Sequence, residues 1–441
     1  MLLSEHLNSS NLKSFSINGL FGYKDVKIPF DKEAVILIAE NGSGKTTILN
    51  ALYYSISCKF IRLMTIYFET IVIEFASGKE VLIKKSDLIS CYKNEDIESE
   101  IISLLSNYIT PRQVDILLRH SKQGLLIEGI HKLRNYIPNE YYHELLSEVL
   151  PKFKNEYEQE RESKIKENLQ EMILYFPTYR RIEEDIKNLG YDDRLRFAEN
   201  DDRLIQFGMD DVIAKFDEIE KNIKDATLKL LPKVNGEMLT QFVEAITPTQ
   251  EIRNSIQSET LNIVLSRVGD NISESNKSKI EELVNSGDIN SNKYDQLVSF
   301  LSKLLTLYEP QKEKDNYIKK FAEVCNNYLH KKRIVYDEKN VKISILQEKN
   351  NKPIEIKHLS SGEKQIISLF SKIYLDSNNE YIVLFDEPEL SLSLEWQRLL
   401  LPDILKSGKC KLLLAVTHSP FIFDNELDTN AIDLDDFITE K

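Results

Sequence analysis

An unbroken apolar run, AVILIA at residues 34–39, leads directly into the polar segment ENGSGKTT and then into a helical pattern. The run does not alternate apolar with polar residues, which is typical of a parallel strand buried on both faces. Two further apolar runs, YIVLF at 381–385 and KLLLAV at 411–416, also predict strands. Because a long helical segment separates the first run from the last two, we expect one α/β domain divided by an insertion.

The glycine-rich segment after the first strand has the composition of a phosphate-binding loop. Gly42 and Gly44 lack a Cβ, so backbone N–H groups can converge on phosphate oxygens, and the next helix directs its positive end at the same anion. Lys45 supplies a charge for the β- and γ-phosphates, and the Thr46 hydroxyl can ligate Mg²⁺. We therefore expect ATP and Mg²⁺ to bind at Glu40, Asn41, Gly42, Ser43, Gly44, Lys45, Thr46 and Thr47. Ala39 stands where glycine is usual, and we expect only a slight change of approach.

Carboxylates and a histidine follow the other two apolar strands. Asp386 ends the strand 381–385 and is placed to hold Mg²⁺ through its water shell. Strand alternation would turn Glu387 another way, leaving it free to polarise a water for attack on the γ-phosphate. His418 lies just beyond the strand 411–416, where α/β sheets bind ligands, and could contact the γ-phosphate or position the water. We predict Glu387 and His418 as catalytic residues, with Thr46 and Asp386 at the metal.

Composition narrows the class of protein. The 441 residues allow two or three domains, and the formal net charge of −14 disfavours non-specific nucleic-acid binding by the surface as a whole. The chain has four cysteines, Cys58, Cys91, Cys325 and Cys410. They form no CxxC pair, which favours a reducing compartment. The sequence shows neither a signal-peptide pattern nor an apolar segment of membrane-spanning length, so we expect a soluble cytoplasmic protein.

The pattern of strands and helices suggests six segments. The first half of the α/β domain spans 1–94, followed by a helical segment at 95–170 and a returning strand at 171–180. A helical insertion spans 181–332, the second half of the domain 333–423, and an acidic tail 424–441. Within the insertion, apolar residues from Val212 to Leu230 have coiled-coil spacing, and we expect that helix to stop at Pro232. So short a run favours a helix in a local bundle over a long coiled coil.

Four motifs together resemble those of the ABC-type ATPases. AENGSGKTT is similar to Walker A, LSSGEKQ at 359–365 to the signature, YIVLFDEP to Walker B, and THSP to the H-loop. The resemblance implies an ABC-type P-loop ATPase head with a mostly helical insertion and no long coiled coil. In this family two heads face each other head to tail, which implies that Ser360, Ser361, Gly362 and Glu363 cap the ATP bound to a second copy's Lys45. ATP would then join two chains, and hydrolysis would release them.

Three features of the family pattern stay open in this sequence. In SLSLEWQ, the D-loop position Ser393 often carries His or Asp in related proteins, which puts a role across the dimer in doubt. Gln113 and Gln123 are both candidates for the Q-loop. Arg180 and Arg181 follow a strand and could reach a phosphate or an interface, or could equally be solvated at the strand end.

The branch of the family follows from the spacing of the motifs. Residues 46–358 separate Walker A from the signature. The chain resembles bacterial AAA-type ABC ATPases of anti-phage systems in its compact insertion and in two stretches, MILYFPTYRRIE and DEPELSLSLEWQ. Among these, the ATPase subunits of the PARIS system are most similar, followed by those of Septu. The resemblance implies a separately encoded effector, a Toprim nuclease for the PARIS type, and a phage protein as trigger. The sequence DLD at 433–435 is similar to a Toprim carboxylate pair, but we interpret it as part of the acidic tail, which could dock a basic partner or simply be solvated.

Two other functions remain open. A RecF-like DNA-repair ATPase would have a basic groove and a strongly salt-dependent response to DNA, and the net charge is mild evidence against it. An ATP-gated assembly scaffold would bind ATP with negligible turnover, and Glu387 argues against it. Direct nucleic-acid binding is not decided by the sequence.

Overall fold

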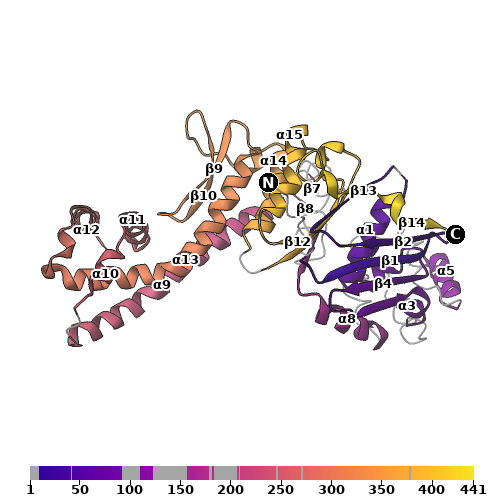
Figure 1. Cartoon of the computed structure of the whole chain (residues 1–441), viewed down its shortest axis with the longest axis horizontal. Coiled ribbons are helices and arrows are strands. Elements are labelled where there is room, and N and C mark those ends of the chain that lie inside the picture. The colour runs from indigo at the N-terminus through magenta and orange to yellow at the C-terminus, as the bar shows by residue number, and fades with distance from the viewer. Residues whose placement is uncertain are drawn as a thin grey trace. The chain divides into compact units, whose positions relative to one another are not determined.

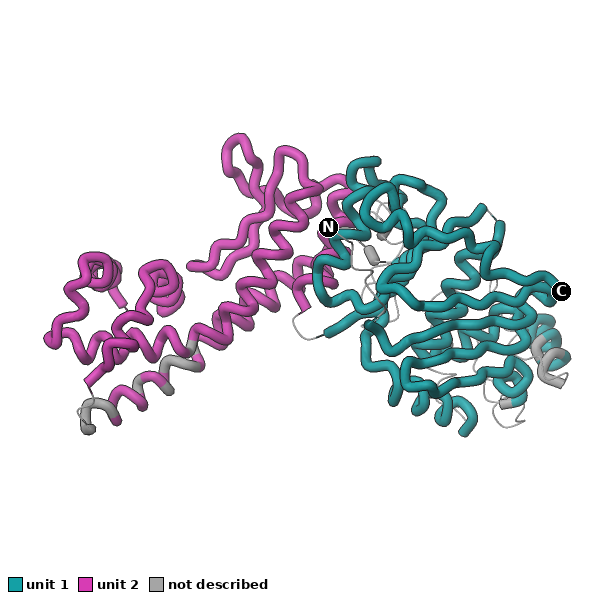
Figure 2. Tube along the Cα trace, viewed as in Figure 1, with its two compact units in different colours: residues 1–206, 379–441 teal, residues 207–378 magenta. Residues whose placement is uncertain are grey.

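The computed structural model describes residues 9–40, 42–91, 110–122, 156–177, 181–182, 206–207, 209–244, 247–269, 272–376 and 379–441. The chain divides into two compact units (Figure 2). Unit 1 comprises residues 1–206 and 379–441, and unit 2 comprises residues 207–378. Unit 1 is therefore built from two segments that are distant in the sequence, whereas unit 2 is one continuous segment.

A parallel sheet of five strands forms the centre of unit 1. The strand order is β13-β3-β12-β11-β6, with bounds Ala431–Asp433, Ala34–Ile38, Cys410–Thr417, Tyr381–Asp386 and Met172–Phe176. Every neighbouring pair is parallel, and Ile38 lies beside Thr417 while Asp386 lies beside Val416. The strands therefore end at one common edge of the sheet, and the buried parallel strands expected from the apolar runs are present.

An antiparallel sheet and several helices complete unit 1 (Figure 1). The sheet order is β14-β2-β1-β4-β5, with bounds Ile438–Glu440, Lys24–Pro29, Leu12–Leu20, Thr70–Phe75 and Glu80–Lys84. The helices are α1 (Lys45–Ile56), α2 (Phe60–Leu63), α3 (Lys85–Cys91), α5 (Pro111–Lys122), α8 (Glu156–Asn168) and α15 (Leu394–Leu405). One apolar core joins both sheets to α1 through residues such as Phe15, Leu49 and Leu414, so α1 is held on both sides.

Unit 2 consists of helices and one hairpin. The helices are α9 (Asp210–Glu244), α10 (Gln250–Asn254), α11 (Ser258–Arg267), α12 (Glu274–Ser286), α13 (Asp295–Asn326) and α14 (Ser361–Tyr374). The antiparallel hairpin is β9 (Lys332–Asp337) and β10 (Lys342–Gln347), and β9 packs on α13. The two-residue strands β7 (Arg181–Ile182) and β8 (Gln206–Phe207) precede α9. The fold class predicted from the sequence, an α/β head with a helical insertion, is confirmed.

Short 3₁₀ turns connect several of these elements. They are η6 (Asp288–Asn290), η7 (Asn292–Tyr294), η8 (Ile356–His358), η9 (Pro420–Ile422), η10 (Asp428–Asn430) and η11 (Leu434–Phe437).

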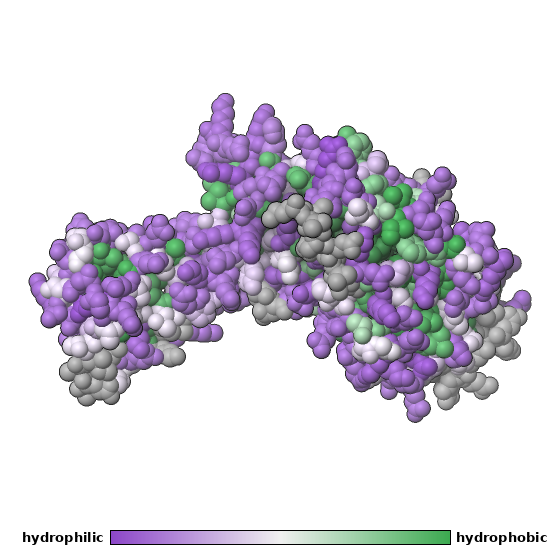
Figure 3. Space-filling model, viewed as in Figure 1, coloured by the Kyte–Doolittle hydropathy of each residue, from purple (hydrophilic) through white to green (hydrophobic). Residues whose placement is uncertain are grey.

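No described helix is long and apolar enough to cross a membrane. The face of the molecule shown in Figure 3 is largely hydrophilic, with apolar residues in smaller patches.

The prediction that the first helix of the insertion stops at Pro232 is wrong. Helix α9 continues through Pro232 to Glu244, and α13 likewise contains Pro310. A proline inside a helix removes one backbone hydrogen bond and crowds the preceding turn, but tertiary packing can outweigh this. The two long helices lie side by side, with the rings of Phe216 and Phe321 in edge contact, and that packing supports α9 (Figure 1).

Residues 424–441, set apart in the sequence as an acidic tail, contribute strands to both sheets of unit 1. Strand β13 extends the parallel sheet and β14 extends the antiparallel sheet. Leu434 between them is fully buried, and the Asn430 side-chain amide donates to the Ala34 carbonyl at 2.7 Å. A few apolar residues among the acidic ones are thus enough to order the segment against the sheets.

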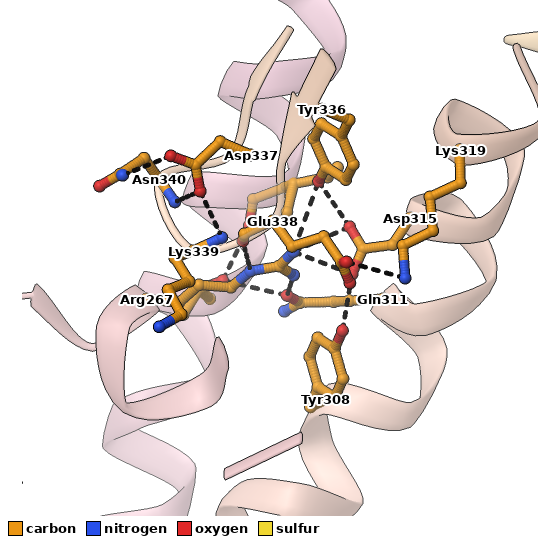
Figure 4. A network of polar contacts seen from close by, with 12 residues as sticks. Arg267, Tyr308, Gln311, Asp315, Lys319, Tyr336, Asp337, Glu338, Lys339 and Asn340 are labelled. Carbon is orange, nitrogen blue, oxygen red and sulfur yellow. Dashed lines mark hydrogen bonds and ion pairs between the residues drawn. The ribbon is translucent and has the colours of Figure 1, made fainter. Parts of the chain in front are cut away.

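A buried ion pair lies where α11, α13 and the hairpin meet in unit 2 (Figure 4). The Arg267 and Asp315 side chains are 2% and 1% exposed. Arg267 Nη2 donates to both Asp315 carboxylate oxygens at 2.8 Å, and Arg267 Nε donates to the Glu338 carbonyl at 2.9 Å. Since a buried charge is tolerated only when it is paired and hydrogen-bonded, each partner depends on the other.

Two tyrosines complete the hydrogen bonding of Asp315. The Tyr308 and Tyr336 hydroxyls donate to its carboxylate at 2.8 and 2.6 Å. Burial, and then the hydrogen bond to Asp315, raises the pKa of both tyrosines, so both stay protonated and remain donors at neutral pH. The network therefore ties β9, through Tyr336, to α11 and α13.

We expect Arg267→Met to destabilise unit 2 strongly, because it leaves the Asp315 carboxylate buried without its counter-charge. Removal of one partner of a buried pair costs about 3–5 kcal/mol. Amide hydrogen exchange of α11 and α13 measures the local loss of stability. The control is Lys312→Met, whose ammonium lies 4.0 Å from Glu309 on the surface and should cost less than about 1 kcal/mol. Equal protection in the two variants would mean that the buried pair contributes no more than the surface pair.

Candidate functional site

The loop between β3 and α1 needs glycine at two positions. Gly42 and Gly44 have φ angles of 86° and 98°, in the left-handed region that side chains disfavour. Gly44 is also the N-cap of α1, and a Cβ there would lie 3.0 Å from the ring of Phe21. The loop can therefore wrap closely over the helix N-terminus only with glycine at these positions.

Lys45, the first residue of α1, is 6% exposed and directs its ammonium back at the loop. Its Nζ donates to the carbonyls of Ala39 and Glu40, at 3.0 Å each, and contacts the imidazole of His418. Burial lowers the pKa of Lys45, although the nearby carboxylates, Glu387 foremost, favour its charged form. Two residues that the sequence identified separately thus meet at the edge of the parallel sheet.

The Thr46 hydroxyl and Asp386 are also brought together. Thr46 Oγ1 donates to Asp386 Oδ2 at 2.9 Å, and Asp386 is fully buried at the end of β11. A hydroxyl and a carboxylate are oxygen ligands of the kind that Mg²⁺ takes, usually with only one or two protein groups beside phosphates and waters. The donor set of these two residues therefore fits Mg²⁺.

The remaining loop residues differ in what they offer. Ser43 Oγ is buried and, within the described part of the chain, has no hydrogen-bond partner, so it is available to an anion. Glu40 contributes its backbone carbonyl, and Thr47 lies in the first turn of α1. Asn41 lies outside the described residues. Ala39, where related loops carry glycine, is not among the described residues with positive φ, so alanine fits without backbone strain.

Glu387 leaves the strand through a left-handed residue. Its φ is 48°, and its N–H donates to the Val416 carbonyl at 2.9 Å, one residue beyond the end of β11. From the sequence we expected strand alternation to turn the side chains of Asp386 and Glu387 in different directions. In the structure the strand has already ended at Asp386, and the chain turns at Glu387. A left-handed non-glycine residue costs about 1–2 kcal/mol and often marks a functional position.

Glu389 is a site residue that the sequence analysis did not single out. Its carboxylate accepts from the Thr417 hydroxyl at 2.8 Å and from the His418 backbone N–H at 3.0 Å. These bonds fix the backbone from which the His418 imidazole reaches Lys45. Its place two residues after Glu387 is the only sequence signal for it, since its partners lie on another strand.

The segment after Glu389 is held to the His418 loop as well. The Gln397 side chain accepts from the Ser419 hydroxyl at 2.6 Å and donates to the Leu392 carbonyl at 3.1 Å. Ser393, the D-loop position, is the N-cap of α15, and its hydroxyl accepts from the Trp396 N–H at 3.3 Å. Ser393 therefore has a local capping role that a serine fulfils well.

The signature residues lie in unit 2, at the N-terminus of α14. Ser360 is the N-cap and forms a capping box with Glu363, in which each side chain accepts from the other residue's backbone N–H. Ser361 is exposed, whereas Gly362 and Glu363 are buried. The amides of Ser361 and Gly362 belong to the first turn, which has no intrahelical acceptors. This end of the helix can therefore donate to an anion.

The sequence left the roles of Gln113, Gln123, Arg180 and Arg181 open. Gln113 lies in the first turn of α5, where its side-chain oxygen accepts from the N–H and the hydroxyl of Thr110, both at 2.8 Å. Gln123 and Arg180 lie outside the described residues, as does the side chain of Arg181. Among the described residues, no group of three or more His, Cys, Asp or Glu side chains could hold a metal ion.

One family match agrees with the geometry of the loop. The family model AAA_15, described as AAA ATPase domain, matches residues 11–423. Solved structures that align with the chain include an Smc head domain with an extended coiled coil, bound to the C-terminal domain of ScpA, from Pyrococcus furiosus. The sequence identity is 14% and the TM-score is 0.31, and the alignment covers 98% of this chain and 96% of that chain. A structure of SmcHead bound to the C-winged helix domain of ScpA aligns at 12% identity and a TM-score of 0.31, covering 98% and 97%. No curated protein matches the chain.

We expect Glu389→Leu to release the backbone at His418, because it removes both hydrogen bonds to the loop. Hydrogen bonds to a charged acceptor are worth about 1.5–3 kcal/mol each, so amide exchange at His418 should rise at least about tenfold. Glu389→Gln should give a smaller increase, since one amide oxygen can still accept. The control is Glu426→Leu, a half-exposed glutamate in unit 1. Unchanged exchange at His418 in Glu389→Leu would show that other contacts hold the loop.

Proposed function

Because the chain belongs to the AAA ATPase domain family, we propose that unit 1 binds ATP with Mg²⁺ at the edge of its parallel sheet and hydrolyses the γ-phosphate bond. One observation carries this proposal. Lys45, the Thr46–Asp386 pair and His418 converge at the carboxyl ends of β3, β11 and β12, although Lys45 and His418 are 373 residues apart. Ligands of open α/β sheets bind at such an edge.

Each residue of the site has a distinct task in this proposal. The loop amides, the Ser43 hydroxyl and Lys45 bind the phosphates, and Lys45 exchanges its two carbonyl acceptors for phosphate oxygens. Thr46 and Asp386 would hold Mg²⁺, which would supply positive charge to neutralise the phosphates. The exposed ring of Phe21, in contact with the glycine loop, offers a flat surface to the base.

Hydrolysis depends on the two residues that follow β11 and β12. Glu387 polarises the attacking water, and its carboxylate is near enough to Lys45 to favour the charged ammonium. His418 positions that water or contacts the γ-phosphate, and its ring contacts the Lys45 ammonium. Glu389 acts through the backbone of His418.

The signature residues complete the site in a second copy of the chain. The N-terminus of α14 offers the Ser361 hydroxyl and two first-turn amides to the γ-phosphate held by the partner's loop. ATP would then join two copies, and hydrolysis would release them. Support for this step comes from the resemblance of LSSGEKQ to the ABC signature.

We propose further that the ATPase regulates a separately encoded nuclease in an anti-phage complex in the cytoplasm. Support comes from the compact insertion and from the stretches MILYFPTYRRIE and DEPELSLSLEWQ, which resemble the ATPase subunits of PARIS and, second, of Septu. In the PARIS arrangement the ATPase holds a Toprim nuclease and releases it when a phage protein is sensed. The ATP-dependent contact between copies would be the state that holds the effector.

We expect Lys45→Ala to abolish ATP binding and Glu387→Gln to preserve it while stopping turnover. Loss of a positioned general base lowers the rate by about 10²–10⁴-fold. Calorimetric binding of Mg²⁺-ATP and phosphate release by the purified full-length protein separate the two effects. Glu395→Gln, an exposed glutamate on α15, is the matched control and should leave both unchanged. Wild-type turnover in Glu387→Gln would remove Glu387 from the mechanism.

We expect the tagged protein, expressed from its own locus, to recover a nuclease in stoichiometric amount, identified by mass spectrometry. A Toprim-type partner would support the PARIS-like function, and an HNH-type partner the Septu-like function. The Lys45→Ala variant serves as the control, because loss of ATP binding should lower recovery. Recovery of the protein alone, or with DNA-repair factors, would contradict the defence function and favour the RecF-like one, while leaving the ATPase assignment in place.

A further inference from the structure

The first turn of α14 is held by a residue far outside the signature. Lys332, the first residue of β9, donates from Nζ to both oxygens of the Glu363 carboxylate, at 2.9 and 2.7 Å. The Glu363 side chain is 6% exposed and that of Lys332 is 25% exposed. The same carboxylate accepts from the N–H and the hydroxyl of Ser360, at 2.8 and 3.0 Å.

The signature motif implies that Glu363 helps to cap ATP, but these contacts give it a role within unit 2. Both of its oxygens are engaged within unit 2, so it is not directed at a nucleotide. Burial acts to raise its pKa, but the hydrogen bonds from Lys332 and Ser360 outweigh burial and hold the pKa below the ordinary value of 4.5. Glu363 is therefore ionised at neutral pH, and Lys332 supplies the charge that balances it.

We propose that Lys332 is a positioning residue for ATP hydrolysis, acting through Glu363 on the signature serines. This inference rests on the proposed function, in which the N-terminus of α14 caps the nucleotide of a second copy. A bare carboxylate at the third position of that helix would lie close to the incoming γ-phosphate and repel it. Lys332 neutralises this charge and fixes the Ser360 backbone, so that Ser361 and the first-turn amides face the phosphate.

Lys332 comes from a strand that is itself firmly held. The Asn326 side chain at the end of α13 accepts from the Ile334 N–H at 2.7 Å and donates to the Ile334 carbonyl at 3.0 Å. Lys332 also pairs with Gln347 in the hairpin. At the other end of β9, Tyr336 donates to Asp315 within the Arg267 network (Figure 4). The ammonium is thus presented from a fixed backbone, as a positioning role requires.

The alternative is that Lys332 only stabilises unit 2. The two roles differ in how they respond to the charge of Glu363. If Lys332 acts by balancing that charge, removal of the charge should make Lys332 dispensable. Glu363→Gln removes the charge, and the new side chain can still form a capping box. A purely structural lysine would not be relieved by that change.

The test uses four variants of the full-length protein: Lys332→Met, Lys332→Arg, Glu363→Gln and the double variant Lys332→Met/Glu363→Gln. We expect Lys332→Met to lower kcat at least about tenfold, the size expected for loss of a charge-assisted hydrogen bond. The Kd of Mg²⁺-ATP for a single copy should not change, because unit 1 binds the nucleotide; it is measured on Glu387→Gln backgrounds at protein concentrations too low for two copies to associate. Lys332→Arg should keep most of the activity, and the double variant should recover most of what Lys332→Met loses.

Two outcomes would overturn the inference: wild-type kcat in Lys332→Met, or a double variant no more active than Lys332→Met. Amide exchange at Ser360 gives a readout that does not need turnover, and it should rise in Lys332→Met and be restored in Lys332→Arg. Failure of the proposed function looks different, since wild-type protein would then lack ATPase activity or Glu387→Gln would keep it. An inactive Glu387→Gln together with a fully active Lys332→Met would remove only the role of Lys332.

Discussion

The parallel alignment of β3, β12 and β11 is the constraint on which the candidate site depends. Because neighbouring strands run the same way, their carboxyl ends lie at one edge, and the residues that follow each strand are brought together whatever their distance in the sequence. Asp386 ends β11, His418 directly follows β12, and Lys45 lies at the end of the loop that follows β3. The strands are buried along almost their whole length, so a shift of register would expose apolar residues and separate these three side chains.

The backbone departs from ordinary geometry at several residues along this edge of the sheet. Positive φ angles occur at Gly42 and Gly44 in the loop after β3 and at Glu387 after β11. The glycines adopt them without a Cβ to crowd, whereas Glu387 is held by a ladder hydrogen bond to β12. Glu389, two residues on, then fixes the backbone of His418. The rigid sheet therefore stabilises a strained turn, and that turn fixes the geometry of the neighbouring loop.

Much of the fold and of the nucleotide-binding half could be predicted because the signals are local. An apolar run followed by a glycine loop, or by Asp-Glu, is read within ten residues, and these segments do meet in the structure. The missed features depend on tertiary contacts. Helix α9 passes through Pro232 because it packs on α13, and residues 424–441 form strands because two sheets offer them open edges. Thr417, which donates to Glu389, and Lys332, which donates to Glu363, lie 28 and 31 residues away, with no periodicity to reveal them.

Two polar clusters of unit 2, among others in its described part, lie at opposite ends of one strand. Lys332 and Tyr336 are four residues apart in β9 and therefore lie on the same face, about 13 Å from each other. Tyr336 joins the Arg267–Asp315 pair, and Lys332 joins Glu363 at the start of α14. Strand β9 is thus bonded near both ends and, through Asn326, in its middle. The conformation of the signature turn therefore depends on the packing of α11 and α13 as well as on the motif itself.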